Sequence, residues 1–116
     1  MDYFEEAIKN LKHQDQYNAY IERGICYRDT NLIDNSINDF LKALEIKKDD
    51  PFANFHLGIN YLMNFNYESA LEKLSAAIEL NKSEPQFYNY KGLALFMSGQ
   101  YEVCLGVYHE ALKFYE

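Results

Sequence analysis

Cysteine and long apolar runs are scarce in this sequence. It contains two cysteines, Cys26 and Cys104, and they have no metal-binding spacing. Two such residues make neither a zinc site nor a disulfide framework, which fits a reducing compartment. No apolar run approaches the roughly 18 to 20 residues that a membrane span needs, and the N-terminal residues lack the basic and then apolar pattern of a signal peptide. We therefore expect a cytoplasmic chain with no membrane partner.

Positive charge is also scarce. Eleven Lys and Arg residues stand against 18 Asp and Glu residues, so the net charge is -7 and the pI is about 4.9. A chain with this charge repels nucleic acid and anionic lipid on average. The hydrophobic content of 48%, with 16% aromatic residues, is enough to build the core of one domain. We expect a folded domain that binds no nucleic acid.

The same landmarks recur along the chain every 34 residues. They are a glycine, a small residue, a bulky residue and an alanine, in three successive copies: Gly24, Ser36, Phe40 and Ala43; Gly58, Ala70, Leu74 and Ala77; Gly92, Cys104, Tyr108 and Ala111. Chance does not place so many matches in register, so the chain is a repeat. The spacing divides it into a short leader and three units: residues 1–16, 17–50, 51–84 and 85–116.

Each unit has the pattern of two helices joined by a short turn. Pro51 can occupy the first turn of a helix, with Asp50 as its natural N-cap. Residues 83–86 (Ser-Glu-Pro-Gln) have the spacing of a capping box at the start of the third unit. Asparagine and glycine lie where the two helices of each unit separate, and these residues suit the left-handed conformation that ends a helix. The separations fall at residues 30–31, 64–66 and 98–100.

The three in-phase glycines need a reason, because glycine inside a helix costs roughly 1 kcal/mol relative to alanine. We expect that the missing Cβ lets the first helix of each unit approach the small residue on its partner helix. These small residues are Ser36, Ala70 and Cys104. A leucine at position 58 should then clash and destabilise the fold.

A 34-residue helical hairpin of this kind resembles the tetratricopeptide repeat. The glycine holds the eighth position of each unit, Tyr27 and Tyr61 hold the eleventh, and the small, bulky and alanine positions follow at 20, 24 and 27. The resemblance covers residues 17–116. It implies an all-α fold, a right-handed α-solenoid of stacked hairpins with about seven helices, in which residues 1–16 supply an N-terminal capping helix.

The sequence offers no constellation for catalysis or for a metal. The three histidines are scattered, and Cys104 lies five residues from His109 on one helix, which points them to different faces. Residues 29–34 begin like a calcium-binding loop but carry Asp34 where that loop needs glycine. We expect no enzyme, no cofactor and no bound metal.

The resemblance implies a ligand groove along the first helices of the units. In the second and third units these helices carry a second apolar face beyond the one that packs on the partner helix, and Met63 and Met97 would make it adaptable. The predicted partner-binding residues are Ile21, Ile25, Arg28, Phe55, His56, Ile59, Leu62, Asn89, Tyr90, Leu93 and Phe96. Of these, the apolar residues from Phe55 to Phe96 are the expected anchors, and Arg28 and His56 the expected polar selectors.

One subclass of the family grips the C-terminal carboxylate of chaperone tails with Lys, Asn, Asn, Lys and Arg. The matching positions here hold Ile21, Ile25, His56, Gln86 and Tyr90, so we expect no carboxylate clamp. The groove instead suits an amphipathic helix or an extended peptide with aliphatic anchors. The expected function is a non-catalytic protein–protein interaction module, an adaptor or scaffold, whose partner is a protein or peptide.

Self-assembly is the alternative function. Stacked repeats usually end in a capping helix with a polar outer face. The last predicted helix instead carries many apolar residues: Val103, Leu105, Val107, Tyr108, Leu112 and Phe114. Either the chain is a fragment of a longer protein, or this face or the groove docks on another copy to make a homo-oligomer.

Overall fold

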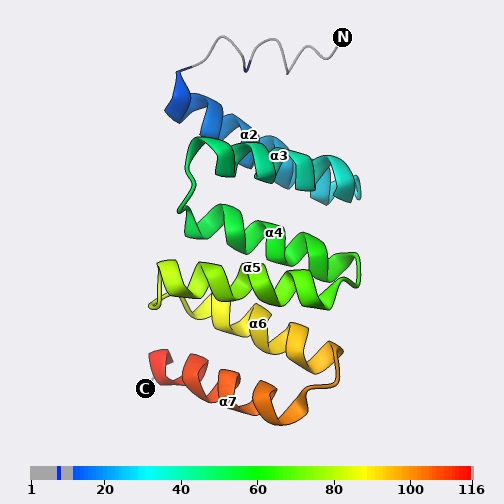
Figure 1. The fold of residues 1–116 in the computed structure, drawn as a ribbon, viewed down its shortest axis with the longest axis vertical. Coiled ribbons are helices and arrows are strands. Elements are labelled where there is room, and N and C mark those ends of the chain that lie inside the picture. The colour runs from blue at the N-terminus through cyan, green and yellow to red at the C-terminus, as the bar shows by residue number, and fades with distance from the viewer. Residues whose placement is uncertain (1–7, 9–11, 116) are drawn as a thin grey trace. The chain divides into compact units, whose positions relative to one another are not determined.

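The computed structural model describes residue 8 and residues 12–115. These residues form six α-helices and a short 3-10 helix, and no strand occurs among them. The α-helices, labelled in Figure 1, are α2 (His13–Asp29), α3 (Ile33–Ile46), α4 (Pro51–Met63), α5 (Tyr67–Leu80), α6 (Pro85–Met97) and α7 (Tyr101–Leu112). The 3-10 helix η1 (Lys113–Tyr115) follows α7. The predicted all-α fold of helical hairpins is confirmed. Within the described ranges no helix is long and apolar enough to cross a membrane.

The expected capping helix falls mostly outside the described residues. Of the leader 1–16, the structure describes residue 8 and residues 12–16. The last four of these already belong to α2, because that helix begins at His13. The first helix of repeat 1 is therefore longer than the 34-residue spacing predicts.

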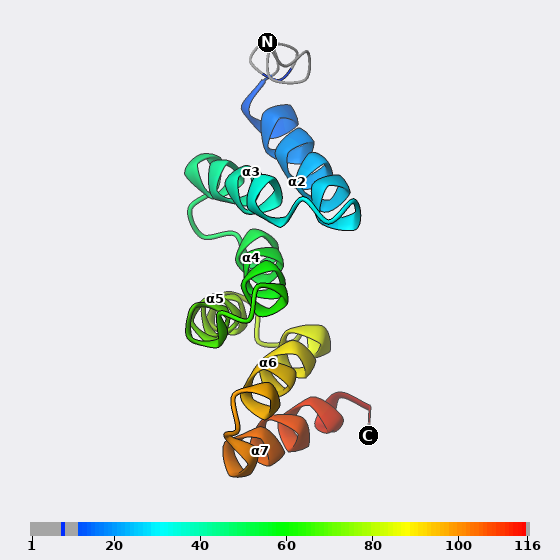
Figure 2. The same cartoon turned by 90° about the vertical axis from the view of Figure 1, so that its right-hand side faces the viewer.

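The helices divide into two compact units, split between Asp49 and Asp50. The first unit contains the hairpin of α2 and α3. The second contains two hairpins, α4 with α5 and α6 with α7, and α5 also packs against α6 (Figure 2). The second unit is therefore a pair of stacked hairpins with a shared core.

The start of α4 follows the prediction, whereas the start of α6 does not. The Asp50 carboxylate accepts hydrogen bonds from the backbone N–H groups of Phe52 (3.3 Å) and Ala53 (3.2 Å), with Pro51 in the first turn. At α6 the N-cap is Glu84, which makes no side-chain cap hydrogen bond. The predicted capping box is wrong there, because the Ser83 hydroxyl and N–H both bond to the Asn81 side chain.

All three hairpins turn through the same motif. The residue after the helix cap has a positive φ in each case: Asn31 (66°), Phe65 (61°) and Gly99 (87°). Its N–H donates to the carbonyl three residues earlier, at 2.9, 3.0 and 3.1 Å respectively, and the next N–H donates to the carbonyl five residues before it, at 2.8 Å in all three turns. This pair of bonds is the Schellman motif, which satisfies the last helical carbonyls and requires the left-handed conformation.

The repeated glycines lie at close helix contacts as predicted, but the nearest side chain to each missing Cβ is the bulky residue. A Cβ built on each glycine would lie 2.6–2.8 Å from the bulky residue of the hairpin rather than from the small one: Phe40 (2.8 Å from Gly24), Leu74 (2.6 Å from Gly58) and Tyr108 (2.7 Å from Gly92). The small residue lies against the glycine carbonyl in two hairpins. The Ser36 hydroxyl donates to the carbonyl of Gly24 (2.6 Å), and the Cys104 thiol to that of Gly92 (3.2 Å).

The first hairpin contains a buried ion pair. Arg23 of α2 donates from Nε and Nη2 to the two carboxylate oxygens of Asp39 on α3, at 2.7 and 2.6 Å. The side chains are 12% and 2% exposed. The guanidinium also lies over the rings of Tyr20 and Tyr27, 5.7 and 5.5 Å from their centroids. The ion pair therefore joins α2 to α3 where the other repeats, 34 and 68 residues further on, have no opposite charges.

Candidate functional site

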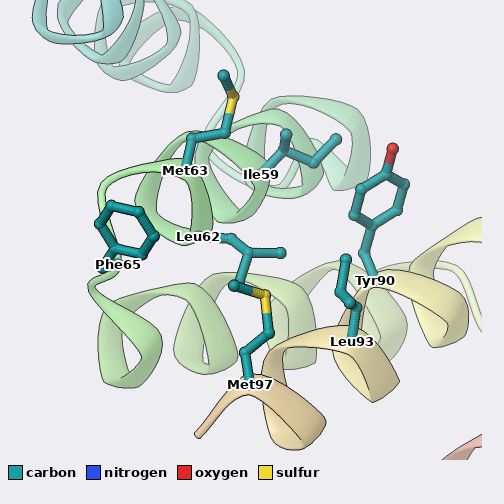
Figure 3. A pocket seen from close by; sticks show the side chains of 7 residues that line it. All are labelled: Ile59, Leu62, Met63, Phe65, Tyr90, Leu93 and Met97. Carbon is teal, nitrogen blue, oxygen red and sulfur yellow. The ribbon is translucent and has the colours of Figure 1, made fainter.

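An apolar groove of about 350 Å³ lies between α4 and α6 in the second unit. Three of its lining residues come from α4, three from α6 and one from the turn after α4: Ile59, Leu62, Met63, Tyr90, Leu93, Met97 and Phe65. Figure 3 shows Leu62 and Met97 pointing toward each other, with Phe65 at one end of the groove and Tyr90 at the other. The Tyr90 hydroxyl is the one oxygen or nitrogen among these side chains.

The groove exists because α4 and α6 carry more apolar residues than the contacts within the hairpins bury. Gly58 is buried where α4 meets Leu74 of α5, and Leu57 beside it is fully buried as well. On α6, Phe87 and Ala94 are fully buried in the core that this helix shares with α5. Six of the remaining apolar side chains line the groove: Ile59, Leu62 and Met63 on α4, and Tyr90, Leu93 and Met97 on α6.

Four of the predicted partner-binding residues line this groove. They are Ile59 and Leu62 on α4 and Tyr90 and Leu93 on α6. Leu93 is 38% exposed, whereas Leu62 is 5% exposed and forms the floor. Sequence reasoning missed Phe65, because a residue in a turn belongs to no helix face that apolar periodicity reveals. The signal that finds it is the 34-residue spacing, which aligns Phe65 with Asn31 and Gly99.

Phe55 is buried between α4 and α6 and is not accessible to a ligand. Its side chain is 6% exposed, and its ring centroid lies 4.8 Å from that of Phe87 and 5.3 Å from that of Tyr90. The expectation that Phe55 is an accessible anchor is therefore wrong, because the ring fills the seam between α4 and α6. His56 is half-buried beside it, with ring centroids 5.4 Å apart.

The other predicted residues lie outside the lining of the groove. Phe96 is 56% exposed, and its ring centroid is 5.4 Å from that of Tyr101. Asn89 is half-buried on α6. Ile21, Ile25 and Arg28 belong to α2 in the first unit, where the Arg28 guanidinium lies 5.9 Å from the centroid of the Phe40 ring.

The described residues show little reactive chemistry. They contain no group of three or more His, Cys, Asp or Glu side chains placed to hold a metal ion. Cys104 is buried, as its small-residue position requires, and Cys26 is exposed. Burial, with a smaller contribution from Cys104, raises the pKa of the Tyr108 hydroxyl above its usual value. This tyrosine therefore stays neutral at physiological pH.

No family model matches the chain. In sequence it is similar to tetratricopeptide repeat protein 13 of Homo sapiens, with 30% identity over 101 residues, 85% of this chain and 11% of that protein. It is also similar to the TPR repeat-containing protein MJ1428 of Methanocaldococcus jannaschii, with 29% identity over 100 residues, 86% of this chain and 17% of that protein. The chain thus spans a small part of these relatives.

The fold is similar to a solved tetratricopeptide domain. The first TPR of Spaghetti (RPAP3), bound to the HSP90 peptide SRMEEVD, matches with a TM-score of 0.82 and 20% identity. The match covers 86% of this chain and 81% of that one. At this level of identity the likeness demonstrates a common fold.

Proposed function

We propose, from the premise that this chain is a tetratricopeptide-repeat protein with three repeats, that it is a non-catalytic protein–protein interaction module. The observation that carries the proposal is the apolar groove of α4 and α6, whose lining has one polar group in seven side chains. The peptide bound to the Spaghetti domain supports the general mode of action, in which a tetratricopeptide domain holds a segment of another protein.

The partner segment is an amphipathic helix. Backbone groups of α4 and α6 are paired within their own helices, so the groove presents no row of backbone donors and acceptors. An extended peptide would bring unpaired N–H and C=O groups against the apolar lining, at about 1–3 kcal/mol for each group left unsatisfied. A helix satisfies its own backbone and offers an apolar stripe. Because the chain has a net charge of -7, a basic polar face suits that helix best.

The groove supports binding of moderate strength. Burying four apolar side chains at roughly 1.5–3 kcal/mol each stabilises the complex by on the order of 10 kcal/mol. Association and side-chain ordering oppose this by several kcal/mol. The remainder corresponds to about micromolar affinity. Reversible binding of this strength suits an adaptor.

A fluorescent probe peptide tests the groove. The probe is a helix of about four turns with Leu at i, i+3, i+4 and i+7 and Lys on the other face. We expect it to bind the wild-type chain, and Leu93→Gln to weaken binding by at least about tenfold, because a buried amide in the groove lacks a partner. Fluorescence anisotropy gives the dissociation constants. The matched variant Leu105→Gln, at a 61% exposed leucine of α7 outside the groove, should bind as wild type.

Two further peptides separate this proposal from its competitors. A peptide of the same composition with Leu at alternate positions has the period of a strand, and tighter binding of that peptide would replace the helix by an extended segment. The peptide SRMEEVD should bind no better than a scrambled version, because the clamp positions carry Ile21, Ile25, His56, Gln86 and Tyr90. If Leu93→Gln and Leu105→Gln weakened binding of the helical probe equally, the probe would be binding non-specifically to apolar surface.

Self-assembly through α7 is a second candidate, favoured by the exposure of its apolar residues. Val103, Leu105 and Leu112 are 55%, 61% and 57% exposed. Under the groove proposal, light scattering of the wild-type chain should give the mass of a monomer, 13.7 kDa, at high concentration. A larger mass that Leu105→Gln returns to the monomer, and Leu93→Gln does not, would favour assembly through α7 instead.

A further inference from the structure

Phe65 combines a strained backbone with an exposed ring. Its φ is 61°, in the left-handed region that a large L-residue adopts unfavourably. The side chain is 71% exposed, more than any other large hydrophobic residue in the described part of the chain. Neither the local backbone preference nor core packing therefore accounts for phenylalanine at this position.

The other two repeats show what the turn itself requires. The equivalent residues are Asn31 and Gly99, both of which tolerate the left-handed region. All three positions make the same two backbone hydrogen bonds, so the motif imposes a positive φ on whichever residue stands there. Asparagine or glycine would satisfy this turn with less strain than Phe65 does. Strain that the surrounding structure maintains at a surface position is typical of a functional site.

The position of the Phe65 ring in the groove indicates what the residue does. Phe65 lines the apolar groove together with Leu62 and Met63, and it stands at the end opposite Tyr90 (Figure 3). The Schellman bonds hold its backbone in place, so the ring is presented from a fixed base. An aromatic ring on a fixed backbone at the end of an apolar groove offers a large apolar contact to a helix that lies in the groove.

We propose that Phe65 is a ligand-contacting, specificity-determining residue that closes one end of the groove and selects a partner helix with a large aliphatic or methionine side chain at that end. The inference rests on the proposed function, since it assigns a role within the same groove. A flexible aliphatic or thioether side chain packs well on an aromatic ring. A small side chain would leave the ring exposed to water, and a charged side chain would lose its own hydration on contact with the ring.

Phe65→Asn is the decisive variant, because it installs the residue that the first repeat uses. Relief of the strained backbone should raise the Tm by about 3 to 8 °C, measured by circular dichroism. The same change should weaken binding of the Leu/Lys helical probe by about tenfold, through loss of the ring contact. The matched control Asn31→Phe introduces the strain in the first hairpin, so it should lower the Tm and leave the affinity for the probe unchanged.

A series of probe peptides, each with one Leu replaced by Ala, locates the contact. One replacement should weaken binding to the wild-type chain and have no further effect on Phe65→Asn, since ring and leucine contact each other. Unchanged affinity of Phe65→Asn, while Leu93→Gln loses the probe, overturns this inference and leaves the proposed function intact. If the Tm of Phe65→Asn did not rise, the backbone at position 65 would not be strained, and this inference would lose its basis. Failure of the probe to bind the wild-type chain rejects both.

Discussion

Gly58→Leu should lower the free energy of unfolding by about 3 kcal/mol and the Tm by roughly 10 °C. A Cβ on Gly58 would lie 2.6 Å from Cγ and 2.8 Å from Cδ2 of Leu74, and 3.4 Å from the carbonyl oxygen of Ala70. Leu74 is fully buried among core side chains, so a shift of its side chain away from the new Cβ requires its neighbours to move as well. The gain in helix propensity on replacing glycine, roughly 1 kcal/mol, is smaller than the cost of separating α4 from α5. Thermal and urea unfolding measure the loss.

Gly106 provides the matched control. It is also a helical glycine, on α7, but a Cβ there meets nothing within 4 Å. Gly106→Leu should therefore leave the stability unchanged or raise it slightly. A double-mutant cycle with Leu74→Ala adds a second test, because shortening Leu74 removes the clash and the two substitutions should destabilise less together than their sum. Additive effects, or equal melting temperatures for Gly58→Leu and Gly106→Leu, would contradict the close contact.

Asp39→Ala should destabilise the chain by about 3 kcal/mol, because it leaves the Arg23 guanidinium without its carboxylate in a nearly dry position. Arg23 donates two short hydrogen bonds to that carboxylate, and the Asp39 side chain is 2% exposed. The rings of Tyr20 and Tyr27 flank the guanidinium, and they cannot replace a negative charge. The far-ultraviolet circular dichroism melt should shift downward, with the first hairpin unfolding first.

The double variant Arg23→Met with Asp39→Leu separates burial from pairing. Apolar residues of similar size remove both charges and keep the packing, so this variant should be close to the wild type in stability and well above Asp39→Ala. If the double variant were as unstable as Asp39→Ala, the attraction between the two charges would exceed the cost of burying them, and the ion pair would stabilise the fold. If Asp39→Ala melted like the wild type, the buried ion pair would have no structural role.

Periodicity made the fold predictable. The recurrence of Gly24, Gly58 and Gly92 at 34 residues established the repeat, and Pro51 with Asp50 marked a helix start that the structure reproduces. These features depend on residues close together in the chain, whose preferences act locally. The apolar second face of α4 and α6 was predictable for the same reason. It gave four of the residues that line the groove: Ile59, Leu62, Tyr90 and Leu93.

Contacts between helices were not predictable in the same way. Helical periodicity shows which residues share a face, but the distance and rotation between two helices decide which side chains meet. Thus the glycines were expected to lie beside the small residues, and Ser36 and Cys104 do bond to the glycine carbonyls. The space of the missing Cβ, however, is taken by Phe40, Leu74 and Tyr108. Phe55 was expected in the groove and instead packs on Phe87, because the close approach of α6 covers it.

Sequence alone therefore determined that the chain consists of repeated helical hairpins with surplus apolar surface on two of their first helices. Tertiary structure alone decided which part of that surface remains open, and it added Phe65, whose position in a turn has no helical periodicity to reveal it. The physical reason is that propensity and hydrophobic spacing are properties of neighbouring residues, whereas burial depends on how side chains from distant segments fill the same space.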